Sequence, residues 1–173
     1  MSVQASVRPP HAGLLGWLAS HDVPYELHEH PVAFTARETA RLEHIDPRTF
    51  AKTLAIMADD GRKALLVVDG ADMLDLVKAR RALEARHVRL LTEEELDELA
   101  PSCDLGTIPP VPELFTLPVL ADYAVRDDPR ITFHAGSHGY CVRVDRLAWE
   151  RAAGITYADL AEERDARPRW ALS

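Results

Sequence analysis

Alternating apolar and polar residues predict a β-hairpin in the first half of the chain. In residues 49–58, Phe50, Leu54 and Ile56 share one face of a predicted strand, and residues 63–69 form a second strand. Asp59-Asp60-Gly61 lies between them and is typical of a hairpin turn, because glycine accepts a positive φ. Further strands are expected over residues 24–28, 131–134 and 140–144.

Helical periodicity and capping signals predict helices between these strands. Thr35 followed by Glu38, and Thr92 followed by Glu95, are capping boxes that open two helices. The helices are expected over residues 14–20, 35–43, 75–86, 92–100, 145–153 and 156–163. Hairpin-connected strands with interspersed helices predict an α+β fold with a mixed, largely antiparallel sheet or barrel, and not a doubly wound sheet. The expected organisation is a flexible arm over 1–12, one domain over 13–163 and a charged tail over 164–173.

A lysine interrupts the apolar face of the first predicted strand. Lys52 falls on the same face as Phe50, Leu54 and Ile56. A cation that points toward an apolar interior is costly unless a polar or anionic group meets it. The alternative is an edge lysine whose stem packs while its ammonium reaches water.

Two loops carry further candidate chemistry. Gly106-Thr107-Ile108-Pro109-Pro110 lies in a long proline-rich loop that can turn amide N–H groups toward a ligand. Gly136-Ser137-His138 forms the polar tip of the predicted hairpin, and a plain β-turn is its alternative. Thr35 could contact a ligand, although its capping role explains it. Asp122 is either a strand-end turn former or a partner for a substrate amine.

Composition excludes several classes of protein. The chain has 173 residues, 47% of them hydrophobic, and no apolar run approaches the roughly 20 residues that span a bilayer. The first ten residues lack the apolar core of a signal peptide, and two cysteines suit a reducing cytoplasm. A net charge of −8 argues against nonspecific nucleic-acid binding, DNA included, but it does not exclude a local basic cluster. Its members are Arg62, Lys63, Lys78, Arg80 and Arg81.

A metal site is the weaker reading of the histidines near the second hairpin. His134, His138 and Cys141 have an H-x3-H-x2-C spacing, but glycines interrupt the segment, so their convergence on a zinc ion is not assured. Nucleotide-binding loops and nucleophile elbows are absent from the sequence. We therefore expect no metal and no cofactor.

Taken in order, these segments resemble the YbaK/prolyl-tRNA-editing family of aminoacyl-tRNA deacylases. The match rests on Lys52 in F-A-K-T-L, the G-x-x-x-P loop from Gly106 to Pro110, Asp122 in L-A-D-Y, and Gly136-Ser137-His138 in F-H-A-G-S-H, with Thr35 after H-P-V-A-F. The order and spacing agree over about residues 14–160.

The resemblance implies a barrel-like mixed sheet surrounded by helices. It also implies a free-standing trans-editing enzyme that hydrolyses the ester of a mischarged tRNA, which the basic cluster would contact. Alanine, serine, cysteine or threonine on tRNA-Pro or a related tRNA would be removed, and a synthetase is a conceivable partner. Lys52 would face the ester, Gly106, Thr107 and Ile108 would supply amides to the oxyanion, and water or a ribose hydroxyl would attack. The substrate would be held by Thr35, Pro110, Asp122, Gly136, Ser137 and His138. A metal-dependent hydrolase and a non-catalytic tRNA- or protein-binding module are the alternatives.

Overall fold

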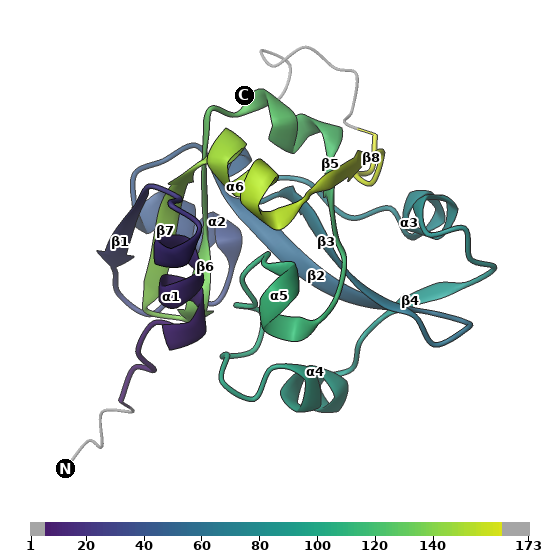
Figure 1. The fold of residues 1–173 in the computed structure, drawn as a ribbon, viewed down its shortest axis with the longest axis horizontal. Coiled ribbons are helices and arrows are strands. Elements are labelled where there is room, and N and C mark those ends of the chain that lie inside the picture. Colours follow the sequence, from purple (N-terminus) through teal and green to yellow (C-terminus); the bar gives the residue numbers. More distant parts are fainter. Residues whose placement is uncertain (1–5, 164–173) are drawn as a thin grey trace.

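A computed structural model describes residues 6–163, which form two β-sheets with helices packed around them (Figure 1). The first sheet is antiparallel throughout, in the order β1 (Tyr25–Glu29), β7 (Tyr140–Asp145) and β6 (Arg130–Ser137). The second sheet has the order β4 (Val88–Leu90), β2 (Ala51–Ala58), β3 (Lys63–Asp69), β5 (Val119–Asp122) and β8 (Thr156–Ala158). In it β2 is antiparallel to β3 and β4, whereas β5 is parallel to both of its neighbours.

The helices begin where side chains can satisfy their free amides. Thr92 with Glu95 forms the reciprocal capping box that the sequence predicts. At α2 only half of the predicted box forms: Thr35 accepts a hydrogen bond from the Glu38 amide at 3.0 Å, but the Glu38 carboxylate accepts the Phe34 amide instead of the Thr35 amide. Within the described residues the α-helices are α1 (Ala12–Ser20), α2 (Ala36–Leu42), α3 (Leu76–Ala82), α4 (Glu93–Leu99), α5 (Pro112–Phe115) and α6 (Arg146–Ala153). Short 3-10 helices cover Pro47–Thr49 and Tyr123–Asp127.

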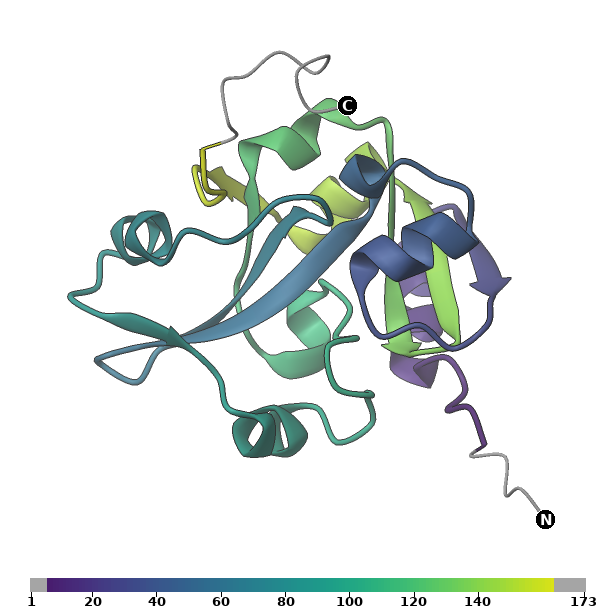
Figure 2. The ribbon, with the colours of Figure 1, turned by 180° about the vertical axis from the view of Figure 1, so that it is seen from behind.

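The helices divide the interior into layers. Figures 1 and 2 show α1 and α2 on opposite faces of the three-stranded sheet. The largest core cluster lies between the two sheets and includes Trp17 of α1, Phe133 of β6 and Trp149 of α6, all buried. A second cluster joins α3, through Ala79, to the other face of the five-stranded sheet. Burial of these faces is the main source of stability for the fold.

The two sheets meet where β2 begins. Phe50 forms an isolated parallel bridge with Thr132 of β6, and its ring packs against the His134 ring with centroids 4.9 Å apart. The α+β prediction with a mixed sheet is confirmed. The barrel-like description is not, because the described strands form two sheets that do not close on each other.

Two predicted helices differ from the structure. Residues 156–158 form β8 and not a helix, because they pair in parallel with Leu120–Asp122 of β5. The predicted helix over 75–86 ends at Ala82, and residues 88–90 form β4, which pairs with β2. Tertiary pairing thus overrides local helical propensity at residues 156–158, whereas β4 lies beyond the end of the predicted helix.

Part of the predicted organisation lies outside the described residues. This is true of the predicted tail over 164–173 and of residues 1–5 of the predicted arm. Within residues 6–163 we find no helix long and apolar enough to cross a membrane.

Candidate active site

The loop over residues 103–110, which we call the glycine–proline loop, is joined to the β6–β7 hairpin by hydrogen bonds. The Gly136 amide donates to the Thr107 carbonyl at 3.0 Å, and the Asp104 amide donates to the Gly136 carbonyl at 3.0 Å. The Asp104 carboxylate also accepts a hydrogen bond from the His138 amide at 3.0 Å. These hydrogen bonds therefore hold together two segments that are distant in the sequence.

Gly136 is required where the loop and the hairpin meet. It has φ +78° and lies at the irregularity in strand register between His134 and Ser137. A Cβ at this position would approach His11 Cβ at 3.0 Å and Cys103 Sγ at 3.3 Å. Both the positive φ and the crowding favour glycine.

The hairpin tip is held by the Ser137 hydroxyl. Ser137 Oγ donates to the Arg8 carbonyl at 2.6 Å and accepts a hydrogen bond from the Gly139 amide at 3.1 Å. Ser137 is fully buried. Its hydroxyl is therefore committed to the turn and to the segment before α1.

A hollow of about 460 Å³ opens beside His138, and we call it the His138 hollow. Phe34 is 67% exposed at its mouth, with its ring centroid 4.8 Å from that of His138. Within the described part of the chain, His138 Nδ1 is buried without a hydrogen-bond partner. The hollow is lined by Ser6, Val7, Arg8, Pro9, Val32, Phe34, Asp104 and His138.

A second hollow of about 410 Å³ lies on the other side of the glycine–proline loop, against α4. Gly106 and Ile108 line this α4 hollow, and Asp104 borders both hollows. Its wall also carries Glu93, Glu94 and Asp97, whose carboxylates disfavour an approaching phosphate. The His138 hollow is therefore the better candidate for a tRNA end.

The loop amides are not equivalent. Thr107 is buried, and its amide donates to the Asp104 carbonyl at 3.1 Å. Within residues 6–163, the amides of Gly106 and Ile108 donate to no other group. The Pro110 carbonyl accepts a hydrogen bond from the buried Trp149 Nε1 at 2.9 Å, which fixes the end of the loop.

Lys52 lies on β2 opposite Val68, and it lines neither hollow. Because strand side chains alternate, it projects on the side that carries Phe50, where α2 packs. Lys52 is partly buried, and burial lowers the pKa of its ammonium below the usual 10.5. Arg37 of α2 lowers this pKa further, while Asp72 opposes the shift.

A buried histidine connects the Lys52 side of the sheet to the hairpin. His134 packs against Phe50 and is 5% exposed. Burial lowers the pKa of His134 to about 3, with contributions from His30 and His138, so its imidazole is neutral at pH 7. His134 Nδ1 and His30 Nε2 are buried without partners among the described residues.

The structure does not gather the histidines into a metal site. His134 lies opposite Cys141 in the β6–β7 register, whereas His138 lies at the hairpin tip. Within residues 6–163, no group of three or more His, Cys, Asp or Glu side chains is placed to hold a metal ion.

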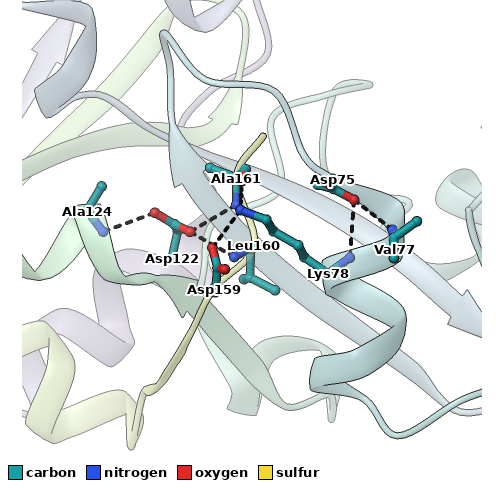
Figure 3. A network of polar contacts seen from close by, with 8 residues as sticks. All are labelled: Asp75, Val77, Lys78, Asp122, Ala124, Asp159, Leu160 and Ala161. Atoms are coloured by element: carbon teal, nitrogen blue, oxygen red, sulfur yellow. Dashed lines mark hydrogen bonds and ion pairs between the residues drawn. The ribbon is translucent and has the colours of Figure 1, made fainter. Parts of the chain in front are cut away.

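Asp122 and Thr35 serve the fold. One carboxylate oxygen of Asp122 accepts the Leu160 and Ala161 amides at 2.8 and 2.9 Å, and the other accepts the Ala124 amide at 3.0 Å (Figure 3). Asp122 is buried and does not line either hollow. Thr35 caps α2 immediately after Phe34 in the chain.

The basic cluster lies on α3 and the β2–β3 hairpin, at the end of the molecule opposite the three-stranded sheet (Figures 1 and 2). Lys78 Nζ donates to Asp159 at 3.0 Å and to the Ala161 carbonyl at 2.8 Å (Figure 3). Arg62 pairs with Asp60 and donates to the Leu83 carbonyl. Lys63, Arg80 and Arg81 have no ion pair within the described part of the chain.

Sequence reasoning missed the residues before α1 and the role of Asp104. Residues 6–9, with the sequence S-V-R-P, carry no periodic signal, so their contacts with the loop and the hairpin cannot be found from the pattern. Asp104 lies within the loop singled out from the sequence. Only the structure shows that its carboxylate holds both Arg8 and the His138 amide.

Comparisons with known proteins identify the family of this chain. A model of the aminoacyl-tRNA editing domain family matches residues 30–152. A proline–tRNA ligase of Acidithiobacillus ferrooxidans is 33% identical over 117 residues, which are 68% of this chain and 20% of the ligase. One of Shouchella clausii is 34% identical over 110 residues, 64% of this chain and 19% of the ligase. The chain thus spans about a fifth of these relatives.

Solved structures give the same picture. A protein proposed to be a trans-editing enzyme for prolyl tRNA synthetase superposes with a TM-score of 0.74 at 26% identity, covering 87% of this chain and 95% of that one. A hypothetical protein superposes with a TM-score of 0.79 at 20% identity, covering 86% and 99% of the two chains, and shows the shared fold alone.

Proposed function

We propose that the chain, which belongs to the aminoacyl-tRNA editing domain family, is a trans-editing deacylase that hydrolyses the ester of a mischarged tRNA. The amino acid removed would be small, such as alanine, serine, cysteine or threonine, on tRNA-Pro or a related tRNA. The observation that carries the proposal is the joining of the glycine–proline loop to the His138 hairpin beside a hollow of about 460 Å³. A site of that size suits the aminoacyl end of a tRNA.

The proposed reaction uses no nucleophile from the protein. Burial raises the pKa of Cys103 to about 11 and that of Cys141 to about 12, so both thiols are protonated at neutral pH. The Ser137 hydroxyl is committed to two hydrogen bonds. Water, or the vicinal hydroxyl of the terminal ribose, would attack the ester carbonyl and release the amino acid.

Lys52 would stabilise the negative charge that develops in this attack. Its ammonium lies on the α2 side of β2 in a partly buried setting, where an ionic interaction is stronger than in bulk water. The Gly106 and Ile108 amides are free among the described residues but line the α4 hollow, so to donate to the tetrahedral oxyanion they would have to turn toward the His138 hollow when the tRNA end binds. The Thr107 carbonyl would hold the loop in place by accepting a hydrogen bond from the Gly136 amide.

Action in trans is supported by the likeness to a protein proposed to be a trans-editing enzyme, 95% of which this chain covers. Its partner would be the acceptor end of an aminoacyl-tRNA, which a synthetase could present, in the cytoplasm where tRNAs are charged. The basic residues Lys63, Arg80 and Arg81 would contact the tRNA away from its acceptor end, since they lie at the opposite end of the molecule from the hairpin. Phosphate contacts there would make binding strongly dependent on salt.

Deacylation of a panel of mischarged tRNAs by the purified protein tests the proposal. We expect release of a small amino acid without added metal, a loss of at least about a hundredfold in kcat/KM for Lys52→Ala, and partial activity for Lys52→Arg. Because the pKa of Lys52 is lowered, kcat/KM should decline at a pH below the usual 10.5 of lysine, once the uncatalysed rate is subtracted.

Three outcomes would contradict this proposal. Full activity of Lys52→Ala would remove the assigned role of the lysine. Bound zinc, together with loss of activity to a chelator, would favour a metal-dependent hydrolase. Tight binding of tRNA without turnover on the whole panel would indicate a non-catalytic binding module.

A further inference from the structure

The segment that precedes α1 is attached to the β6–β7 hairpin at two points and to the glycine–proline loop at a third. The His11 amide donates to the Ala135 carbonyl at 2.8 Å, and the Arg8 carbonyl accepts the Ser137 hydroxyl at 2.6 Å. The Arg8 guanidinium pairs with Asp104 at 3.0 Å. These contacts come from residues outside the part of the chain that matches the family model, 30–152.

Val7 lies directly over the hairpin tip. A Cβ added at Gly139 would collide with Val7 Cγ1, whereas Val7 Cβ would lie at an ordinary contact distance of 3.6 Å. The absence of a side chain at Gly139 therefore lets the segment approach this closely.

The segment also forms one side of the His138 hollow. Residues 6–9 supply four of the eight described residues that line it, and so form one of its sides. Val32 and Phe34 stand on another side, while Asp104 and His138 complete the lining.

Asp104 couples this segment to His138 at the hairpin tip. One of its carboxylate oxygens accepts Arg8 Nε, and the other accepts the His138 amide. The Arg8 side chain is 41% exposed, so the ion pair by itself contributes little to stability. Its effect is geometric, because the same carboxylate fixes both the segment and the hairpin tip.

We propose that residues 6–9 form a wall of the aminoacyl pocket, and that Val7 limits the size of the aminoacyl group that the pocket accepts. This inference rests on the proposed deacylase function. The residues that build the wall lie outside the range that the family model matches, 30–152.

A double-mutant cycle between Val7 and Gly139 tests the selectivity. One tRNA is charged in turn with alanine, threonine and valine, and kcat/KM is measured for wild type, Val7→Ala, Gly139→Ala and the double variant. Val7→Ala should raise the ratio of kcat/KM for the valyl over the alanyl ester about tenfold, because a methylene in a closed pocket is worth about that factor. Gly139→Ala should raise it by a similar factor by displacing Val7.

The double variant should show no more than the effect of Val7→Ala alone, because an alanine at position 7 leaves room for the new methyl group. Effects that multiply in the double variant would contradict the direct contact. An unchanged ratio in both single variants, with activity intact, would overturn the role in selection.

Amide hydrogen exchange tests the wall without relying on catalysis. Arg8→Ala should speed exchange of the His138 and Gly139 amides severalfold, and Arg8→Lys should restore part of the protection. Arg130→Ala is the matched control, because it removes an exposed arginine, 4.0 Å from Glu26, at the other end of β6. Unchanged amide exchange in Arg8→Ala would contradict the proposal that residues 6–9 form a wall of the pocket.

The two experiments separate the failure of this inference from the failure of the proposed function. A wild-type protein inactive on every ester would refute the deacylase, and with it the role of Val7 in selection. Hydrogen exchange would still decide whether residues 6–9 close the hollow.

Discussion

Asp122 offers a direct test of whether a residue singled out from the sequence serves the fold or the substrate. Its carboxylate accepts the amides of Ala124, Leu160 and Ala161, and so ties the end of β5 to the segment that follows β8 (Figure 3). We expect Asp122→Ala to destabilise the protein strongly, because three amides lose their acceptor.

The magnitude follows from the burial of these hydrogen bonds. The bond from the Leu160 amide is fully buried, and leaving that amide unsatisfied costs about 2 kcal/mol. The bonds from Ala124 and Ala161 are partly buried, and each contributes about 1 kcal/mol because water can replace the lost acceptor. The free energy of unfolding should therefore fall by about 4 kcal/mol, which lowers Tm by roughly 10 °C in a chain of this size.

Asp122→Asn is the informative partner variant. One amide oxygen can still accept the Leu160 and Ala161 amides, but the NH2 group then faces the Ala124 amide, so a loss of only about 1–2 kcal/mol is expected. Urea unfolding gives the stabilities, and deacylation is measured well below Tm. In the structural role, kcat/KM per folded molecule stays at the wild-type value in Asp122→Asn. Wild-type stability in Asp122→Ala would refute the reasoning. A loss of kcat/KM in a fully stable Asp122→Asn would indicate that Asp122 binds the substrate.

Two further predictions concern stability and are both measured by urea unfolding. His134 has a folded pKa of about 3 against 6.5 when unfolded, so the unfolded state takes up the proton first as the pH falls, and wild type should lose about 2 kcal/mol from this group between pH 7 and pH 5. His134→Gln should lack that loss, and an identical pH dependence in the variant would contradict the assignment. Gly136→Ala should cost more than about 2 kcal/mol, through the positive φ and the crowding against His11. Gly154→Ala, at φ +62° with open space around it, should cost only about 1 kcal/mol, and equal costs would show that crowding plays no part.

The likeness of this chain to editing deacylases could be found from the sequence because it rests on an ordered set of short segments. The order and the residue types of these segments can be seen in the sequence itself. The family match over residues 30–152 confirms the resemblance. The roles of individual residues are different. Asp122 is the same residue whether it binds an ammonium group or three amides, and only the positions of Ala124, Leu160 and Ala161 distinguish the two.

The sequence by itself determined what depends on neighbours along the chain. The alternation in residues 51–58 and the glycine at position 61 specify the β2–β3 hairpin, and Thr92 with Glu95 specifies the start of α4. The placement of Lys52 on the face of Leu54 and Ile56 follows from strand alternation alone.

Only the tertiary structure decided which distant segments meet. The strands β4 and β8 have three residues each, too few for a periodic signal, and they exist because β2 and β5 offer them backbone partners. Residues 6–9 carry no periodic pattern. Their place over the hairpin depends on the Ser137 hydroxyl, the Asp104 carboxylate and the missing side chain at Gly139, all far along the chain. Local patterns record the covalent neighbourhood of a residue, whereas these contacts are set by the packing of the whole fold.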